Sequence, residues 1–146
     1  MSVQIRKMEQ RDRLFLPFMA KDDDGWADTI RHNIYSMPYD QDGSLMQAYV
    51  AADDDELVGF VFGFALPNKL LIPELMYVKP SHRRKGISKK LLRTLEENSG
   101  CTMSQIFYNK SLHDCYAKQG YCSEDNLEAA YKVLHLKETN QTRSEL

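Results

Sequence analysis

The residues with the clearest chemical pattern in this chain are the cations between Lys79 and Arg93. Seven lysines and arginines fall in this stretch, and no acidic residue interrupts them. A strand-like apolar run precedes it, and an amphipathic helical pattern follows Gly86. Because the N–H groups at a helix start attract anions, and glycine lets a ligand approach the backbone, the segment predicts a phosphate-binding turn. The alternative is a solvated basic helix face.

The order of the residues in this segment also resembles that of a known protein family. Val78 and Pro80 precede Arg83-Arg84-Lys85-Gly86-Ile87-Ser88, and Leu91-Leu92 follow. This resembles the acyl-CoA loop of the GNAT N-acetyltransferase superfamily, whose core pattern is Gln/Arg-x-x-Gly-x-Gly/Ala. Ser88 stands where the family has glycine or alanine, which leaves its backbone N–H available and adds a hydroxyl.

A second block strengthens the resemblance. Residues 109–121 read Asn-Lys-Ser-Leu-His-Asp-Cys-Tyr-Ala-Lys-Gln-Gly-Tyr. They are similar to the family's Asn-x-x-Ala-x-x-Leu-Tyr-x-x-x-Gly-Phe, with Asn109, Tyr116, Gly120 and Tyr121 in register. Asp55-Glu-Leu-Val-Gly-Phe60 also resembles the hairpin that enters the family's third strand. Together these blocks cover residues 48–136.

The resemblance implies where acetyl-CoA binds. Pantetheine would pair with the backbone of the strand that ends at Met76 to Val78, and pyrophosphate would meet the N–H groups from Arg84 to Lys89. Asn109 would contact the pantetheine arm, or cap a helix, or do both. The expected cofactor-binding residues are Met76, Val78, Arg83, Arg84, Lys85, Gly86, Ile87, Ser88, Lys89 and Asn109. No metal is expected.

Two residues are candidates for catalysis by acid and base. Acetylation needs an uncharged amine, so a base or a water chain takes the amine proton. Glu74 lies among apolar residues of the strand that leads to the basic turn, an unfavourable place for a carboxylate without a role. Some family members have a glutamate base on this strand. A partly exposed carboxylate that binds only solvent is the alternative reading of Glu74.

Tyr116 is the candidate acid, because a phenol can protonate or stabilise the departing CoA thiolate. Its place in the second block matches the family's general-acid tyrosine. The alternative is a packing role, since Leu112, Cys115 and Gln119 share its helix face. Cys115 as an acyl carrier is less favoured than direct transfer, because a cysteine in an apolar row is usually inert.

The pattern of apolar residues predicts an α/β (α+β) domain. The resemblance implies a GNAT-like acyl-CoA N-acyltransferase fold, with a mixed, mostly antiparallel sheet flanked by helices. We expect one domain over residues 1–139 and a polar tail over 140–146. Strands are expected at 2–7, 48–52, 57–65, 70–78, 105–108 and within 127–137. Helices are expected around 14–19, from a cap at Asp24 to near Pro38, at 86–98 and at 109–118.

Composition narrows the functional class. The chain has 146 residues, 42% of them hydrophobic, which suits one globular domain. The longest apolar run without a charged residue, 57–68, is too short to cross a bilayer. Cys101, Cys115 and Cys122 are odd in number and match no zinc spacing, so a reducing cytoplasm is expected. We expect no membrane partner, and the sequence leaves open whether the chain forms a homodimer.

The acceptor is less well specified. Residues 1–73 contain 7 Lys and Arg against 12 Asp and Glu. The resemblance places Trp26, Tyr35, Met37 and Tyr39 on the acceptor side, near Asp22, Asp23, Asp24, Asp28, Asp40 and Asp42. An acidic rim would attract a cationic amine, either small or part of a protein; a solvated loop is the alternative. Two other functional classes are alternatives to an acetyltransferase. One is a CoA-binding sensor without activity, and the other is a nucleic-acid-binding module that uses residues 79–93.

Overall fold

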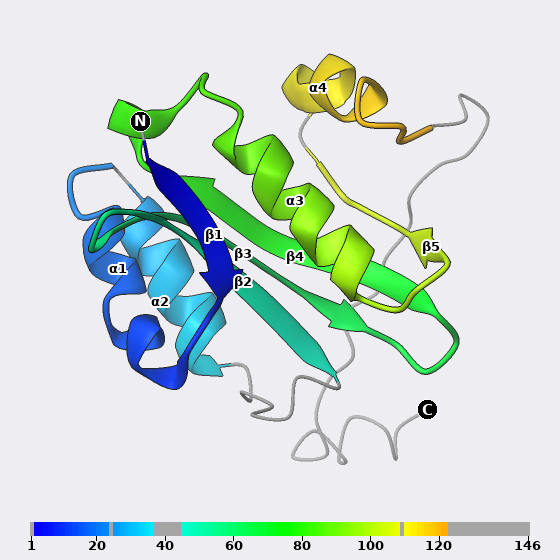
Figure 1. Ribbon diagram of the computed structural model, residues 1–146, viewed down its shortest axis with the longest axis horizontal. Coiled ribbons are helices and arrows are strands. Elements are labelled where there is room, and N and C mark those ends of the chain that lie inside the picture. Colours follow the sequence, from blue (N-terminus) through cyan, green and yellow to red (C-terminus); the bar gives the residue numbers. More distant parts are fainter. Residues whose placement is uncertain (1, 24, 37–44, 109, 123–146) are drawn as a thin grey trace, which may run out of the picture. The chain divides into compact units, whose positions relative to one another are not determined.

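A computed structural model describes residues 2–23, 25–36, 45–108 and 110–122 of the chain (Figure 1). The chain divides into two compact units, Met1–Lys110 and Ser111–Leu146, each of which is described by itself. The predicted boundary between a domain over 1–139 and a tail over 140–146 lies outside the described residues and stays a prediction. None of the described helices is long and apolar enough to span a membrane.

The first unit is built on one sheet with helices on both sides. Its elements, in chain order, are β1 (Val3–Lys7), the 3₁₀ turn η1 (Gln10–Leu14), α1 (Leu16–Met19), α2 (Trp26–Ser36), β2 (Met46–Asp53), β3 (Glu56–Ala65), β4 (Leu70–Val78), the 3₁₀ turn η2 (Pro80–His82), α3 (Ile87–Asn98) and β5 (Met103–Ser104).

The strand order is β1-β2-β3-β4-β5. The first four strands pair antiparallel, and β5 joins β4 in parallel through Leu70 opposite Met103 and Leu71 opposite Ser104. The turn between β2 and β3 contains Asp54 with a φ of 54°, a left-handed conformation that aspartate tolerates better than most residues. The predicted mixed, mostly antiparallel sheet and its acidic hairpin are therefore confirmed.

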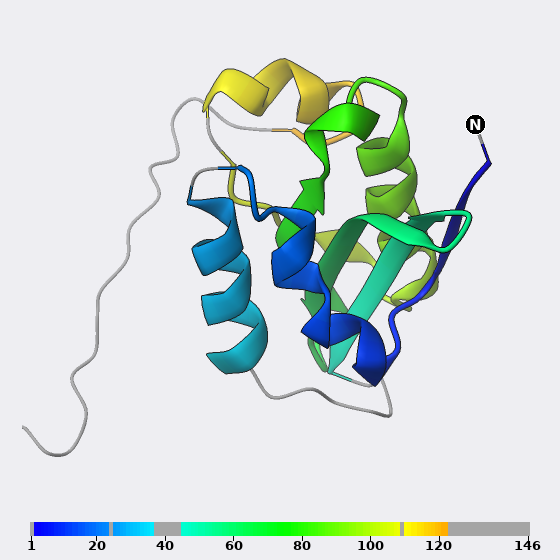
Figure 2. The same cartoon turned by 90° about the vertical axis from the view of Figure 1, so that its left-hand side faces the viewer.

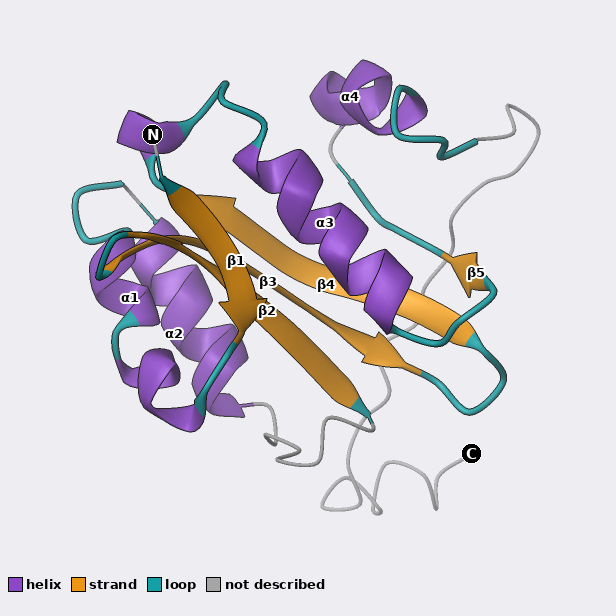
Figure 3. Cartoon of the chain, viewed as in Figure 1, coloured by secondary structure: helices purple, strands orange, loops and turns teal. Residues whose placement is uncertain are grey.

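Alternating side chains of the central strands divide the core into two layers. Helices α1 and α2 cover one face of the sheet and α3 covers the other (Figures 2 and 3). On the first face, Val50, Phe60 and Phe62 pack with Leu16 and Ile30. On the second face, Ala51, Val61 and Leu71 pack with Leu91 and Leu95 of α3. This two-layer burial fixes β4 and α3 side by side, with the turn between them at one end of the sheet.

Most predicted elements are present, with differences at the ends. The amphipathic helix expected at 86–98 is α3, whose Ile87, Leu91, Leu92 and Leu95 are at most 2% exposed. The prediction of a strand at 105–108 is wrong. Strand β5 lies at Met103–Ser104, and the chain leaves β4 after Gln105, whose backbone N–H donates to Leu71 O. The expected cap Asp24, the helix end near Pro38 and the strand within 127–137 lie outside the described residues.

The described part of the second unit, Ser111–Leu146, is short and helical. A 3₁₀ turn, η3 (Lys110–Leu112), crosses the boundary between the units and leads directly into α4 (His113–Ala117). Tyr116 is the buried residue of α4, and its ring lies edge-on to Tyr121 with a centroid distance of 6.0 Å. The helix expected at 109–118 is thus confirmed over its central part.

Candidate active site

Strand β4 contains a bulge at Glu74. Phe62 of β3 pairs with Leu75 and Gly63 pairs with Pro73, so Glu74 has no partner across the ladder. A Cβ on Gly63 would lie 2.6 Å from Ile72 O and 2.9 Å from Pro73 Cα, which no side chain allows. Glycine at this position therefore lets the two strands approach beside the bulge, and the bulge redirects β4 in its second half.

Beyond Leu71, no described strand pairs with the edge of β4 that faces β5. Strand β5 pairs only with Leu70 and Leu71, and the last backbone bond between the two segments joins Gln105 N to Leu71 O at 2.9 Å. Figure 3 shows β5 and the following segment diverging from β4. Unpaired strand edges accept another extended chain, so the run from the bulge to Val78 offers a backbone ladder for a ligand arm.

The turn after β4 has an unusual backbone. Pro80–His82 form a 3₁₀ turn, and Arg84 and Gly86 then adopt φ values of 62° and 80°. A Cβ at Gly86 would meet no atom within 4 Å, so the space in front of this residue is open. The left-handed φ explains why glycine suits this position, and the open space is what a phosphate group would need.

Helix α3 begins with free amide groups. Its first backbone bond runs from Lys90 N to Gly86 O at 3.1 Å. The amides of Ile87, Ser88 and Lys89 therefore have no partner within the helix, and the positive end of the helix dipole adds to their attraction for anions. The Ile87 side chain is 2% exposed and packs in the core, so only its backbone is available to a ligand.

Three exposed cations lie close to these amides in the sequence. Arg84, Lys85 and Lys89 are exposed, and none of them forms an ion pair within the described residues. Unpaired cations beside a helix start raise the local concentration of anions. The turn and the first turn of α3 thus form one anion-attracting surface, made from five of the residues expected from the sequence: Arg84, Lys85, Gly86, Ser88 and Lys89.

Arg83 differs from its neighbours because its side chain binds the protein itself. Its Nε donates to Val78 O at 2.8 Å and its guanidinium donates to Asp23 Oδ2 at 2.9 Å. The guanidinium carbon lies 5.3 Å from the centre of the Tyr77 ring. These contacts tie the turn to the end of β4 and to the segment between α1 and α2.

Asp23 completes this cluster. The buried Tyr77 hydroxyl donates to Asp23 Oδ2 at 2.7 Å, and the Tyr77 ring packs on Trp26 with centroids 5.2 Å apart. Burial, and then the hydrogen bond to Asp23, raise the pKa of Tyr77 to about 12. The hydrogen bond from Tyr77, followed by that from Arg83, holds the pKa of Asp23 below its usual value. Asp23 is therefore a structural anion rather than a free carboxylate.

On its other side the turn is held by the β2–β3 hairpin. His82 Nε2 lies 2.9 Å from Asp53 Oδ2, and Lys79 Nζ pairs with Glu56. The bond from Lys79, and its positive charge, hold the pKa of Glu56 below the usual range. No local sequence pattern indicates these contacts or the Asp23 cluster, because the partners lie between 23 and 60 residues apart.

The comparisons with known proteins identify the family. A sequence model described as an acetyltransferase (GNAT) domain matches residues 44–123, more than half of the chain. The chain belongs to the GNAT acetyltransferase family. No curated protein is significantly similar to it. The predicted family and the predicted enzyme class, a GNAT-type acetyltransferase, are confirmed.

Solved GNAT structures share the fold at low sequence identity. The PaiA N-acetyltransferase of Thermoplasma acidophilum, solved with coenzyme A, is 21% identical with a TM-score of 0.70, over 86% of this chain and 93% of that one. The aminoglycoside N-acetyltransferase AAC(6')-Iy, in complex with a bisubstrate analogue, is 15% identical with a TM-score of 0.66, over 93% and 100% of the two chains. The ribosomal-protein-alanine N-acetyltransferase of Brucella melitensis biovar Abortus 2308 is 20% identical with a TM-score of 0.65, over 91% and 100%.

Within this GNAT fold, the two catalytic candidates have different surroundings. Glu74 is exposed at the bulge, as in the alternative reading of a solvent-exposed carboxylate, so only its position argues for a catalytic role. Tyr116 is 9% exposed, and burial, with a smaller effect of Cys115, raises the pKa of its phenol. Tyr116 belongs to the second unit, and Asn109 lies outside the described residues.

The described residues contain no group of three His, Cys, Asp or Glu side chains that could hold a metal ion.

Proposed function

We propose that this protein transfers the acetyl group of acetyl-CoA to a primary amine by direct attack in a ternary complex. The observation that carries the proposal is the continuous path formed by the α3 amides, the β4 edge beyond Leu71 and the bulge. A cofactor with a pyrophosphate at one end, a strand-like arm and a reactive thioester at the other matches such a path in the order of its parts.

Each part of the path has an assigned partner on acetyl-CoA. The amides of Ile87, Ser88 and Lys89 receive the pyrophosphate, and Gly86 leaves room for it. Arg84, Lys85 and Lys89 supply positive charge. The pantetheine arm pairs with β4 at Met76, since Val78 O already accepts a hydrogen bond from Arg83. Arg83 itself serves as the residue that holds the turn, through Val78 and Asp23.

The chemical step balances as follows. The neutral amine nitrogen attacks the thioester carbon, the C–N bond forms, and the tetrahedral intermediate collapses with cleavage of the C–S bond. Glu74, directly or through water, takes the proton lost by the amine. The phenol of Tyr116, the residue that the family resemblance assigns to this step, donates a hydrogen bond to the CoA sulfur, which leaves as the thiolate. Because a raised phenol pKa makes full proton transfer less favourable, we assign Tyr116 mainly to hydrogen-bond stabilisation of the thiolate.

The acceptor is an amine of a small molecule or of a protein. Two of the aspartates expected to form an acidic rim on the acceptor side already have partners. Asp23 binds Tyr77 and Arg83, and Asp28 pairs with Arg31. Asp22 is exposed, while Asp24, Met37, Tyr39, Asp40 and Asp42 lie outside the described residues. Proteins with similar structures include an aminoglycoside N-acetyltransferase and a ribosomal-protein-alanine N-acetyltransferase, which supports testing both acceptor classes.

The test is product formation. The protein is mixed with acetyl-CoA and a panel that includes an aminoglycoside, simple alkylamines and an alanine-terminated peptide, and acetylated products are measured by mass. A mass gain of one acetyl group, with release of one thiol, supports the proposal. Tight acetyl-CoA binding without product from any amine indicates a CoA sensor, and binding of nucleic acid without acetyl-CoA binding indicates the third class.

A further inference from the structure

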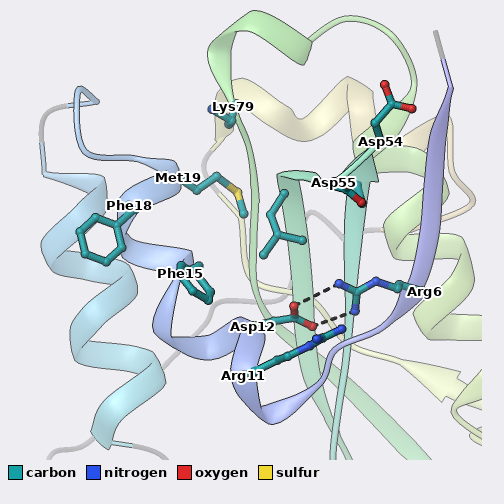
Figure 4. Close-up of a pocket in the computed structure, with 11 residues that line it drawn as sticks. Arg6, Arg11, Asp12, Phe15, Phe18, Met19, Asp54, Asp55 and Lys79 are labelled. Atoms are coloured by element: carbon teal, nitrogen blue, oxygen red, sulfur yellow. Dashed lines mark hydrogen bonds and ion pairs between the residues drawn. The ribbon is translucent and has the colours of Figure 1, made fainter.

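A cavity on the α1 face of the sheet has no part in the path proposed for acetyl-CoA. Its volume is about 570 Å³, within the range of small-molecule sites. It lies between η1 and α1 on one side and the β2–β3 turn on the other (Figure 4). Among the described residues that line it, only Lys79, which begins the turn after β4, adjoins the proposed acetyl-CoA site.

The cavity is also remote from the bulge where the thioester is expected. Glu74 and Lys79 are five residues apart along β4, which corresponds to roughly 16 Å of extended strand. None of the residues that line the cavity belongs to the set assigned to acetyl-CoA or to proton transfer. The acetyl transfer reaction therefore leaves this cavity unexplained.

One wall of the cavity is apolar and unusually exposed. Phe15 and Phe18 are 59% and 67% exposed, and Figure 4 shows Met19 pointing into the cavity, whereas the Phe18 ring is turned away from Asp54 and Asp55. An exposed phenyl ring and a methionine at a cavity are typical of a ligand site, because covering them removes apolar surface from water. The face of a phenyl ring also attracts cations.

The charges around the cavity leave a negative excess. Each of its three cations already has a carboxylate partner: Arg6 pairs with Asp12, Arg11 with Glu9, and Lys79 with Glu56. Asp54 and Asp55, on the opposite side from the phenyl rings, form no ion pair within the part of the chain that the structure describes. The charges that a ligand would meet unpaired are therefore both negative.

We propose that this cavity binds an organic cation, with an alkyl or aryl body against Phe15 and Met19 and an ammonium group facing Asp54 and Asp55. The combination of an aromatic wall and two unpaired carboxylates favours this ligand over a neutral or anionic molecule of the same shape. The site is separate from the acceptor amine site, and its occupation does not depend on acetyl transfer.

The test uses three probes of matched shape and no acetyl-CoA: 2-phenylethylammonium, neutral 2-phenylethanol and anionic 3-phenylpropanoate. Binding to the full chain is measured by calorimetry, and the site by chemical shifts of backbone amides. We expect the ammonium to bind most tightly and to shift the amide signals of Phe15, Leu16, Phe18, Met19 and residues 54–57. We expect its affinity to fall as salt increases.

Variants localise the charge recognition. The double change Asp54→Asn with Asp55→Asn removes both charges, and asparagine tolerates the left-handed φ of Asp54. We expect binding of the ammonium to weaken about five- to tenfold, the size of two surface ion pairs, while 2-phenylethanol is unaffected. Asp22→Asn is the matched control, since Asp22 is exposed but does not line the cavity.

Four results would overturn the proposal: no binding of the ammonium at millimolar concentration, equal or tighter binding of the neutral or anionic probe, shifts at the β4 bulge instead of the cavity, or an effect of Asp22→Asn as large as that of the double variant. The last two would place the amine at the acceptor side. Because the binding experiment contains no acetyl-CoA, a negative result in it leaves the proposal of acetyl transfer unaffected.

Discussion

Gly86 combines two requirements at one residue. Its φ of 80° is costly for any side chain, and the open space in front of it gives a ligand access to the first amides of α3. A larger residue here would both strain the turn and fill that space. The two effects are separable, because Gly100 at the other end of α3 has a similar φ of 73° and similarly open surroundings.

We predict that Gly86→Val weakens CoA binding at least tenfold, whereas Gly100→Val leaves it within about twofold. Both variants should lose a similar amount of stability, about 1–2 kcal/mol from the left-handed backbone. Calorimetric titration with CoA and thermal unfolding of both variants measure the two effects. Unchanged CoA affinity in Gly86→Val would remove the pyrophosphate from this turn.

Tyr116 is tested by removing only its hydroxyl. Tyr116→Phe keeps the ring that packs on Tyr121, so folding and CoA affinity should persist. If the phenol serves the departing thiolate, kcat at saturating acetyl-CoA falls by about 10²-fold to 10⁴-fold. A kcat within about twofold of wild type, at equal melting temperature, would leave Tyr116 with a packing role only.

At the level of elements, the bulge in β4 depends on the strand beside it. A methyl group on Gly63 would clash with the backbone of Ile72 and Pro73, whereas one on Gly59 would lie 3.0 Å from Tyr77 O and 3.3 Å from the Leu91 side chain. The first contact involves backbone from two residues of β4, so it can be relieved only by moving that strand.

We predict that Gly63→Ala lowers the free energy of unfolding by about 1–3 kcal/mol and lowers kcat more than it raises the KM for acetyl-CoA, because it displaces the bulge. Gly59→Ala, on the same strand, should destabilise less and leave the kcat close to wild type. Urea denaturation and steady-state kinetics provide both readouts. Equal effects of the two substitutions would show that the bulge has no special role.

A second link between elements makes stability depend on pH. Asp12 of η1 is 4% exposed and accepts hydrogen bonds from the Arg6 guanidinium of β1 at 2.8 and 3.1 Å and from Glu9 N at 2.7 Å. Burial alone raises the pKa of this carboxyl, but the hydrogen bond from Arg6 and then that from Glu9 outweigh it. The pKa of Asp12 is therefore below its usual value.

A carboxyl whose pKa is lowered by folding stabilises the fold above its unfolded pKa, about 3.9, and this contribution is lost as the pH falls through the lower folded value. We predict that Asp12→Asn loses about 1–2 kcal/mol at pH 7, and that the gap to wild type narrows below about pH 4. Urea denaturation at pH 7, 5 and 3 measures it. A gap that is constant over this range would contradict the assignment.

For the whole molecule, local patterns predicted the elements better than the contacts between them. The periodicity of Ile87, Leu91, Leu92 and Leu95 was enough to predict α3, and its buried face confirms it. The β4 bulge could not be predicted, because it depends on the fit of Gly63 against another strand. Likewise, no spacing reveals that Asp23 meets Arg83, 60 residues away, since tertiary packing alone brings them together.

The same distinction separates the cations of the basic turn. Their shared charge predicted an anion site, and Arg84, Lys85 and Lys89 are exposed near the start of α3 as expected. Arg83 carries the same charge but binds Asp23 and Val78, which only the folded chain shows. Glu74 was expected among apolar side chains, yet the bulge leaves it exposed.

The central claim is that acetyl-CoA lies along one path from the start of α3 to the β4 bulge, and a crystal structure of the chain with CoA bound tests it most directly. We predict pyrophosphate oxygens within hydrogen-bond distance of the amides of Ile87, Ser88 and Lys89, an arm paired with β4 at Met76, and the sulfur beside Glu74. CoA bound at the α1-face cavity, or with its pyrophosphate away from the α3 amides, would contradict the account.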